Sequence, residues 1–187
     1  MNRWLALLIN MAAFYALWVA AMFGAGKTWW WMVPVLALLS MVGQLRFSPS
    51  PKREMYLILA GAAVGTSLDW LGATLGLFRF VSQSTTEFLT LFGALWVNFG
   101  TTLRPSFGWM WRRPLLAALL GAIGGSSSYW VGAQIGAIAF VAPEWRGLLW
   151  VAVQFGIALP VWMLIANHTI GERAETGRRQ TSHGAMR

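Results

Sequence analysis

Cysteine is absent from the 187 residues of this chain. Its absence excludes disulfide bonds, thiolate metal sites and cysteine nucleophiles. Charged residues are scarce at 11%, whereas soluble domains usually carry about 25%. The two histidines, His168 and His183, stand beyond the last long apolar segment. No predicted span therefore offers an imidazole as a metal ligand or as the base for a serine nucleophile.

Apolar residues make up 57% of the chain and lie in long blocks, not in alternating or heptad patterns. The mean hydropathy is +0.57. A helix needs about 20 apolar residues to cross a bilayer. The sequence therefore predicts an all-α membrane protein with six transmembrane helices. The expected spans are Trp4–Phe23, Trp29–Leu45, Met55–Leu77, Phe88–Leu103, Leu115–Val141 and Gly147–Ala166.

The net charge of +8 invites a nucleic-acid partner, but the basic residues stand at the ends of the apolar blocks. That distribution is typical of topology signals, so we expect no nucleic-acid partner. With the N-terminus inside, the outer loops hold only Lys27, Arg79 and Arg146. The bias predicts both termini in the cytoplasm. The inner segments hold Arg3, Arg46, Lys52, Arg53, Arg104, Arg112, Arg113, Arg173, Arg178, Arg179 and Arg187.

Residues 1–166 are expected to form a single six-helix transmembrane domain. Residues 167–187 are polar and interrupted by glycines, which predicts a disordered cytoplasmic tail. Two helix starts have local signals. Ser50-Pro51 is typical of a cap followed by the first helical residue. Ser84, with Glu87 three residues later, is typical of a capping box.

An internal repeat relates the third and fourth spans to the fifth and sixth. Gly65–Phe80 aligns with Gly125–Phe140 without gaps, and Val97–Gly100 aligns with Val153–Gly156. Two copies that lie two spans apart share one orientation, so the sequence predicts a parallel hairpin repeat. The identical pairs in the first alignment are Gly65/Gly125, Ser67/Ser127, Trp70/Trp130, Gly72/Gly132, Ala73/Ala133, Gly76/Gly136 and Phe80/Phe140.

Asp69 is the one charged residue deep inside a predicted span. An aspartate at the centre of a membrane helix costs about 2.5–3.5 kcal/mol on insertion scales, so it needs a partner or a purpose. It shares one helix face with a row of glycines, and the fifth span carries a similar row. Small residues let membrane helices approach closely, so both rows predict helix–helix contacts. The rows are Gly61, Gly65, Gly72 and Gly76, and Gly121, Gly125, Gly132 and Gly136.

Other polar residues are expected at a depth similar to that of Asp69, about 12–15 Å from the outer surface at 1.5 Å per residue. They predict a polar cluster in the outer half of the bundle. One interpretation is hydrogen bonding between helices, and the other is a site for a ligand, a proton or a lipid headgroup. No catalytic residue, metal site or cofactor is predicted. The candidate cluster is Asp69, Asn98, Tyr129, Gln154, Ser127 and Ser128.

Three segments carry a resemblance to a known family: Ser67–Phe78 (SLDWLGATLGLF), Ala94–Phe99 (ALWVNF) and Gly121–Tyr129 (GAIGGSSSY). They resemble the DUF2878 family of bacterial inner-membrane proteins, over roughly the third to sixth spans. The resemblance implies a multi-pass protein of the bacterial inner membrane. The family has no established activity, and some members stand in gene clusters with fatty-acid-modifying enzymes and a stress regulator. No catalytic residue can be transferred.

Three functions are compatible with these features. The first is a non-catalytic or accessory factor in membrane-lipid and envelope stress metabolism, with membrane lipid and other envelope or lipid-modifying proteins as partners. The second is a small transporter or proton-coupled carrier, although only Pro34 and Pro160 interrupt the spans and transporters usually have broken helices. The third, an enzyme that uses Asp69, lacks a second deep carboxylate. The oligomeric state is not predicted.

Overall fold

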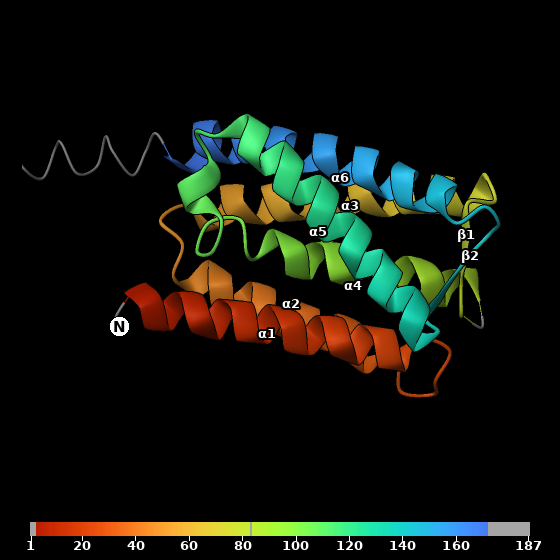
Figure 1. Ribbon diagram of the computed structural model, residues 1–187. Helices are drawn as coiled ribbons and strands as arrows, with labels where there is room; N and C mark the ends of the chain where they lie inside the picture. The colour runs from red at the N-terminus through yellow and green to blue at the C-terminus, as the bar shows by residue number, and fades with distance from the viewer. Residues whose placement is uncertain (1–2, 83, 172–187) are drawn as a thin grey trace, which may run out of the picture.

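A computed structural model describes residues 3–82 and 84–171. The described residues form a bundle of six α-helices that run side by side along one axis (Figure 1). A short two-stranded ribbon and two irregular helical turns complete the structure. The helices are α1 (Arg3–Gly24), α2 (Met32–Arg46), α3 (Pro51–Thr74), α4 (Thr85–Gly100), α5 (Pro114–Ile135) and α6 (Trp145–Ala166). The remaining elements are β1 (Phe78–Phe80), the 3-10 turn η1 (Gly108–Met110), β2 (Ile138–Phe140) and the π-helical turn η2 (Asn167–Gly171).

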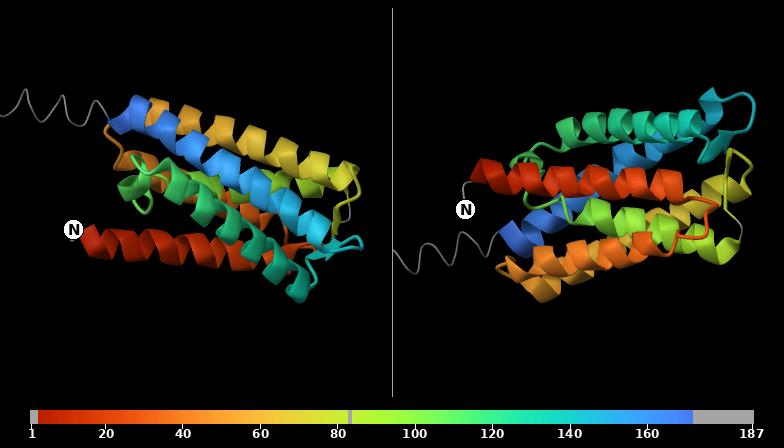
Figure 2. Two further views of the ribbon diagram at one scale, coloured as in Figure 1. Left: turned by 45° about the horizontal axis from the view of Figure 1, so that its top comes forward. Right: turned by 90° about the horizontal axis from the view of Figure 1, so that it is seen from below.

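Helix α4 lies at the centre of the bundle. It contacts α1, α2 and α3, while α6 packs between α3 and α5 (Figure 2). The start of α1 and the end of α6 lie at the same end of the bundle, opposite the ribbon (Figure 1). Most of the buried side chains of α4 are aromatic or aliphatic, including Phe88, Phe92 and Trp96. The core therefore forms around α4, which is the second shortest of the six helices.

Large apolar side chains cover the outside of the bundle. Leu115 is 87% exposed, and exposed Leu, Val, Ile, Phe or Trp side chains occur on all six helices. Soluble proteins rarely expose such extensive apolar surface. Four helices, α1, α3, α5 and α6, are long and apolar enough to cross a membrane. Helix α2 is a shorter apolar helix of 15 residues. At 16 residues, α4 is about 24 Å long, which is less than the roughly 30 Å of a bilayer core.

Helices α3 and α5 end earlier than the sequence predicts. The third and fifth spans were expected to reach Leu77 and Val141, but α3 ends at Thr74 and α5 at Ile135. The reason is a glycine with positive φ just beyond each end, Gly76 (+71°) and Gly136 (+86°). A left-handed glycine stops a helix and satisfies its last carbonyls with backbone N–H groups.

Both of these helix ends have the same hydrogen bonds. The Leu77 N–H donates to the Gly72 carbonyl over 3.1 Å, and the Ala137 N–H donates to the Gly132 carbonyl over 3.0 Å. Strands β1 and β2 follow and pair antiparallel, with Phe78 opposite Phe140 and Phe80 opposite Ile138. The sequence does not predict these strands, because they lie within continuous apolar segments. Gly76 and Gly136 keep the spacing of the glycine rows and so look like helical positions.

The other glycines confirm the predicted close contacts between helices. A Cβ added at Gly65 would collide with the Trp96 ring of α4, and one added at Gly125 would collide with the Phe155 ring of α6. A Cβ at Gly61 would collide with the Trp162 ring. The absence of a side chain at these positions therefore lets large rings of α4 and α6 approach the backbones of α3 and α5.

The helix starts agree in part with their sequence signals. Helix α3 begins at Pro51, but the Ser50 side chain makes no capping hydrogen bond. At α4, the Glu87 N–H donates to Ser84 Oγ over 3.1 Å, which confirms this half of the capping box. Of the predicted tail, residues Asn167–Gly171 continue α6 as the η2 turn. Residues 172–187 lie outside the described part of the chain.

Candidate functional site

Asp69 occupies a completely buried position on α3, with 0% of its surface exposed. Its Oδ2 atom accepts a hydrogen bond from Trp96 Nε1 over 2.7 Å. Its Oδ1 atom accepts two bonds, from the Tyr129 hydroxyl over 2.5 Å and from Gln154 Nε2 over 2.7 Å. The donors belong to α4, α5 and α6. A single carboxylate thus connects four of the six helices; we call these four residues the Asp69 cluster.

Glycines and aromatic rings form the walls of the Asp69 cluster. Gly65, four residues before Asp69, admits the Trp96 ring, which stacks on the Phe155 ring at a centroid distance of 4.7 Å and an angle of 19°. The Tyr129 ring packs edge-on against Phe155 and against Phe78, at 6.2 and 5.6 Å. Each of the four members of the cluster is at most 6% exposed. The surrounding rings therefore keep the cluster away from bulk water.

The Asp69 carboxylate has no cationic partner among the described residues. Among residues 3–82 and 84–171, the ion pair found is that of Arg104 with Glu54. Three neutral donors surround Asp69 instead, at 2.5–2.7 Å, which is the short range of charge-assisted hydrogen bonds. In a low-dielectric interior such bonds are strong, and an unpaired carboxylate would be very costly. The three donors are therefore what makes a carboxylate tolerable here.

The two carboxylate oxygens differ in what they can do. Trp96 Nε1 can only donate, so it offers no acceptor for a proton carried by Oδ2. Oδ1 faces Tyr129 and Gln154, whose side chains can both donate and accept. The Gln154 carbonyl oxygen, Oε1, is buried without a hydrogen-bond partner in the described structure. A half-turn of the Gln154 amide would bring this acceptor to Oδ1, so a proton carried by Oδ1 would have a hydrogen-bond acceptor.

Only some of the side chains in the candidate cluster contact Asp69. Tyr129 and Gln154 meet Asp69, but Asn98 does not. Asn98 is buried with its Nδ2 donating to the Phe14 carbonyl over 3.0 Å, and its Oδ1 has no partner in the part of the chain that the structure describes. Ser128 Oγ accepts from Trp18 Nε1 over 3.0 Å.

Ser127 is exposed on the outside of α5. The one hydroxyl of the expected cluster that contacts Asp69 is therefore that of Tyr129.

Sequence reasoning missed Trp96. Its indole N–H was not counted as a donor, because a tryptophan in an apolar run is indistinguishable from a packing residue. A signal was present in the spacing. Gly65 stands one helical turn before Asp69, and a missing side chain there leaves room for a large ring from the neighbouring helix.

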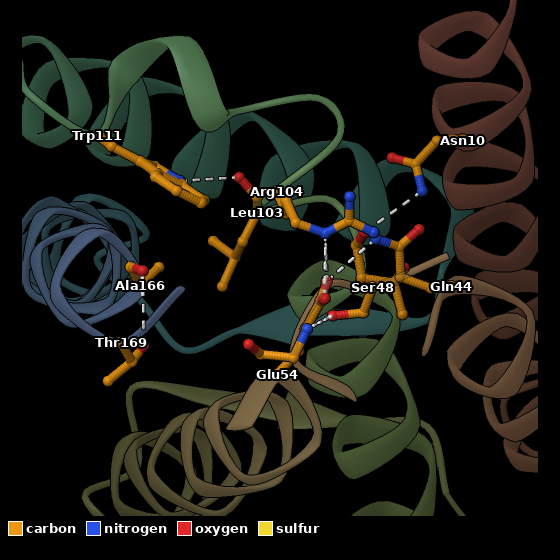
Figure 3. Close-up of polar contacts among 11 residues, drawn as sticks. Asn10, Gln44, Ser48, Glu54, Leu103, Arg104, Trp111, Ala166 and Thr169 are labelled. Carbon is orange, nitrogen blue, oxygen red and sulfur yellow. Dashed lines mark hydrogen bonds and ion pairs between the residues drawn. The ribbon is translucent and has the colours of Figure 1, made fainter. Parts of the chain in front are cut away.

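A second polar cluster, also missed, lies at the end of the bundle where α3 begins (Figure 3). The Glu54 carboxylate is 2% exposed and accepts from Arg104 Nε over 3.0 and 3.1 Å. Gln44 Nε2 of α2 donates to Glu54 Oε1 over 3.0 Å. Opposite charges at the start of one span and the end of the next were a usable signal, because antiparallel neighbours bring those ends together.

The segment that follows α4 is anchored beside this second cluster. Asn10 of α1 donates through Nδ2 to the Thr101 carbonyl over 3.3 Å, and its Oδ1 accepts from Ser106 Oγ over 2.6 Å. Thr101 and Thr102 are buried, and each hydroxyl bonds back to a carbonyl in the last turn of α4. Irregular backbone at the edge of a membrane domain needs such internal partners.

Neither cluster has the arrangement of a catalytic or metal centre. In the part of the chain that the structure describes, no group of three or more His, Asp or Glu side chains can hold a metal ion. The Asp69 cluster pairs its acid with an indole, a phenol and an amide, and it is closed to solvent. The arrangement can connect helices and can hold one proton.

Comparison with known proteins identifies the family. No curated protein and no solved structure matches the chain. Residues 7–161 match the family described as "Protein of unknown function (DUF2878)", which covers most of the chain, including all four members of the Asp69 cluster. The chain belongs to the DUF2878 family, a family of unknown function, and has helices capable of spanning a membrane.

Proposed function

We propose that this protein is a non-catalytic integral membrane protein that acts as an accessory factor in membrane-lipid and envelope metabolism. The observation that carries the non-catalytic assignment is the closed Asp69 cluster. Its carboxylate is fully buried and bonded to three other helices, which suits a helix-joining role and leaves no route for a substrate. The lipid context is supported by the apolar exterior and by the gene neighbours that the family resemblance implies.

The same proposal has six helices crossing the bacterial inner membrane, with both termini in the cytoplasm. The alternation of basic residues supports this topology. So does the position of the start of α1 and the end of α6 at one end of the bundle (Figure 1). Helix α4 is short, but the buried segment after it adds length on the inner side.

We further propose that α3–α4 and α5–α6 are copies of one hairpin. The matching ends of α3 and α5 support this relation. The strand register supports it too, because exchanging the aligned positions leaves the pairing unchanged: Phe78 faces Phe140, and Phe80 faces Ile138. A two-fold relation between the copies would produce such a register.

A deletion strain tests the lipid role. We expect its lipid composition under oxidative stress to differ from that of the parent, and the wild-type gene to restore it. Asp69→Asn, which keeps an acceptor for Trp96, should also restore it, whereas Asp69→Leu should not. An unchanged lipid profile after deletion would exclude a lipid role. Failure of a well-folded Asp69→Asn variant would exclude a purely structural Asp69.

A proton-coupled carrier is the second candidate function, and one observation favours it. The Asp69 carboxylate has three neutral donors and no cation, so a proton is the natural means of neutralising its charge. Proton binding at Oδ1 and reversal of the Gln154 amide would form a two-state element within the closed cluster.

Proton uptake by proteoliposomes after an imposed pH gradient distinguishes the carrier from the accessory factor. A carrier should take up protons in the wild type and lose uptake in Asp69→Asn. The matched control is Ser127→Ala, because Ser127 is exposed on the outside of α5 and makes none of the Asp69 hydrogen bonds. No uptake by the wild type above that of empty liposomes would remove this candidate.

A further inference from the structure

Arg104 has two terminal amino groups that make no hydrogen bond to the described residues. Both contacts with Glu54 use Nε, at 3.1 Å to Oε1 and 3.0 Å to Oε2. Among the described residues, no acceptor bonds to either terminal nitrogen, and the side chain is 24% exposed. A guanidinium has five N–H groups in a rigid plane. The four terminal N–H groups therefore have no acceptor among the described residues, and they belong to a side chain that is partly exposed.

The buried Glu54 carboxylate sets the orientation of the Arg104 guanidinium. Glu54 is almost completely buried and receives a second bond from Gln44, so its carboxylate cannot turn freely. Figure 3 shows Arg104 and Gln44 converging on the Glu54 carboxylate. An arginine held through Nε presents its outer edge in one direction, which reduces the rotamer entropy lost when that edge binds a ligand.

The position of Arg104 matches the headgroup region of a membrane. Its partner Glu54 is the fourth residue of α3, so the pair lies about 5 Å from the start of this helix. Phe47, just after α2, is 75% exposed at the same end, and exposed aromatic side chains favour the interface. Arg46 and Lys52 are exposed in the same connection. Because the Glu54–Arg104 pair is neutral overall, the positive charge at this end of the bundle comes from Arg46 and Lys52.

We propose that Arg104 binds the phosphate of an anionic phospholipid headgroup, with Glu54 and Gln44 as positioning residues. A phosphate oxygen pair accepts two parallel N–H bonds from the edge of a guanidinium. The neighbouring positive charges favour a lipid with net negative charge over a zwitterionic one. This site is separate from the Asp69 cluster, and it requires only that the bundle lies in a membrane.

Phospholipid selectivity in detergent tests the site. Purified protein is mixed with phosphatidylglycerol and phosphatidylcholine, and the bound lipids are counted by native mass spectrometry. The main variant is Glu54→Gln/Arg104→Gln, which removes the guanidinium without changing the net charge and leaves no unpaired buried carboxylate. We expect its preference for phosphatidylglycerol to fall about tenfold, because one charge-assisted pair is lost. The matched control, Lys52→Gln, removes an exposed charge and should retain most of the preference.

Two further variants keep the test decisive if the double variant misfolds. Arg104→Lys keeps the charge, but its ammonium is engaged by Glu54 and has no planar edge, so the preference should fall. Glu54→Gln alone keeps the guanidinium, and the new amide oxygen can still accept from Arg104 Nε, so the preference should be kept. Equal selectivity in the wild type and the Arg104 variants would overturn the proposal. Displacement of the lipid by millimolar inorganic phosphate would overturn the lipid assignment in favour of a soluble phosphate.

Discussion

Replacing Asp69 by leucine or by asparagine separates the hydrogen bonds of the Asp69 cluster from its charge. Leucine has the same branched shape, with bulkier methyl groups in place of the oxygens, but offers no acceptor. It would leave the Trp96 N–H, the Tyr129 O–H and the Gln154 amide unbonded in a closed core. Asparagine offers one carbonyl and one amino group in the same shape. The two substitutions therefore differ in whether the Trp96, Tyr129 and Gln154 side chains keep a hydrogen-bond partner at position 69.

The hydrogen-bond geometry sets the expected size of each effect. Hydrogen bonds between membrane helices contribute roughly 0.6–1.7 kcal/mol each, so the loss of three by Asp69→Leu should cost about 2–5 kcal/mol. In Asp69→Asn, the new carbonyl can accept from Trp96 while the new amino group donates to the Tyr129 oxygen and to Gln154 Oε1, which has no other partner. This variant should lose about 1 kcal/mol or less.

Unfolding in a denaturing detergent, followed by tryptophan fluorescence, measures these free energies. The control is Asp69→Leu combined with Tyr129→Phe, which removes one of the stranded donors. It should be more stable than the sum of the two single changes predicts, because the two sites share one hydrogen bond. A leucine variant as stable as the wild type would refute the assignment of Asp69 as a helix-joining residue.

Three further predictions concern topology and the glycines. A reporter active only outside the cytoplasm should be silent when fused after Arg187 and active in the 82–86 loop; the reverse would refute the N-in topology. Gly65→Leu should destabilise the bundle by several kcal/mol because of its collision with an α4 ring, whereas Gly43→Leu, with nothing within 4 Å of the added Cβ, should be nearly neutral in the same unfolding assay. Gly76→Ala should cost about 1 kcal/mol from its positive φ alone, and an unchanged stability would show that this turn is not held in the left-handed region.

Residues that act through their own helix could be predicted from the sequence. The glycine contacts at Gly61 and Gly65 follow from spacing along one helix face. The burial of Asp69 follows from the cost of exposing a charge to lipid. The ends of α3 and α5 could not be located this way, because a glycine in a contact row and a glycine in a left-handed turn look the same in one dimension.

Pairs that come from different helices depended on the packing. Tyr129 and Gln154 were in the expected cluster, yet so were Ser127 and Ser128, and only the rotation of α5 decides which of these faces α3. The rotation puts Tyr129 inside and Ser127 outside. Trp96 became a donor because α4 lies against the gap at Gly65.

The sequence by itself determined the class of the protein: the apolar blocks need a membrane, and the lone deep carboxylate needs partners. The basic residues predict an orientation. These conclusions rest on transfer free energies, which are properties of single residues and short segments. Tertiary structure alone decided that four helices meet at Asp69 and that Glu54 holds Arg104 with its outer edge free. Those arrangements depend on directional hydrogen bonds between segments up to 85 residues apart, and no local pattern records the relative rotation of two helices.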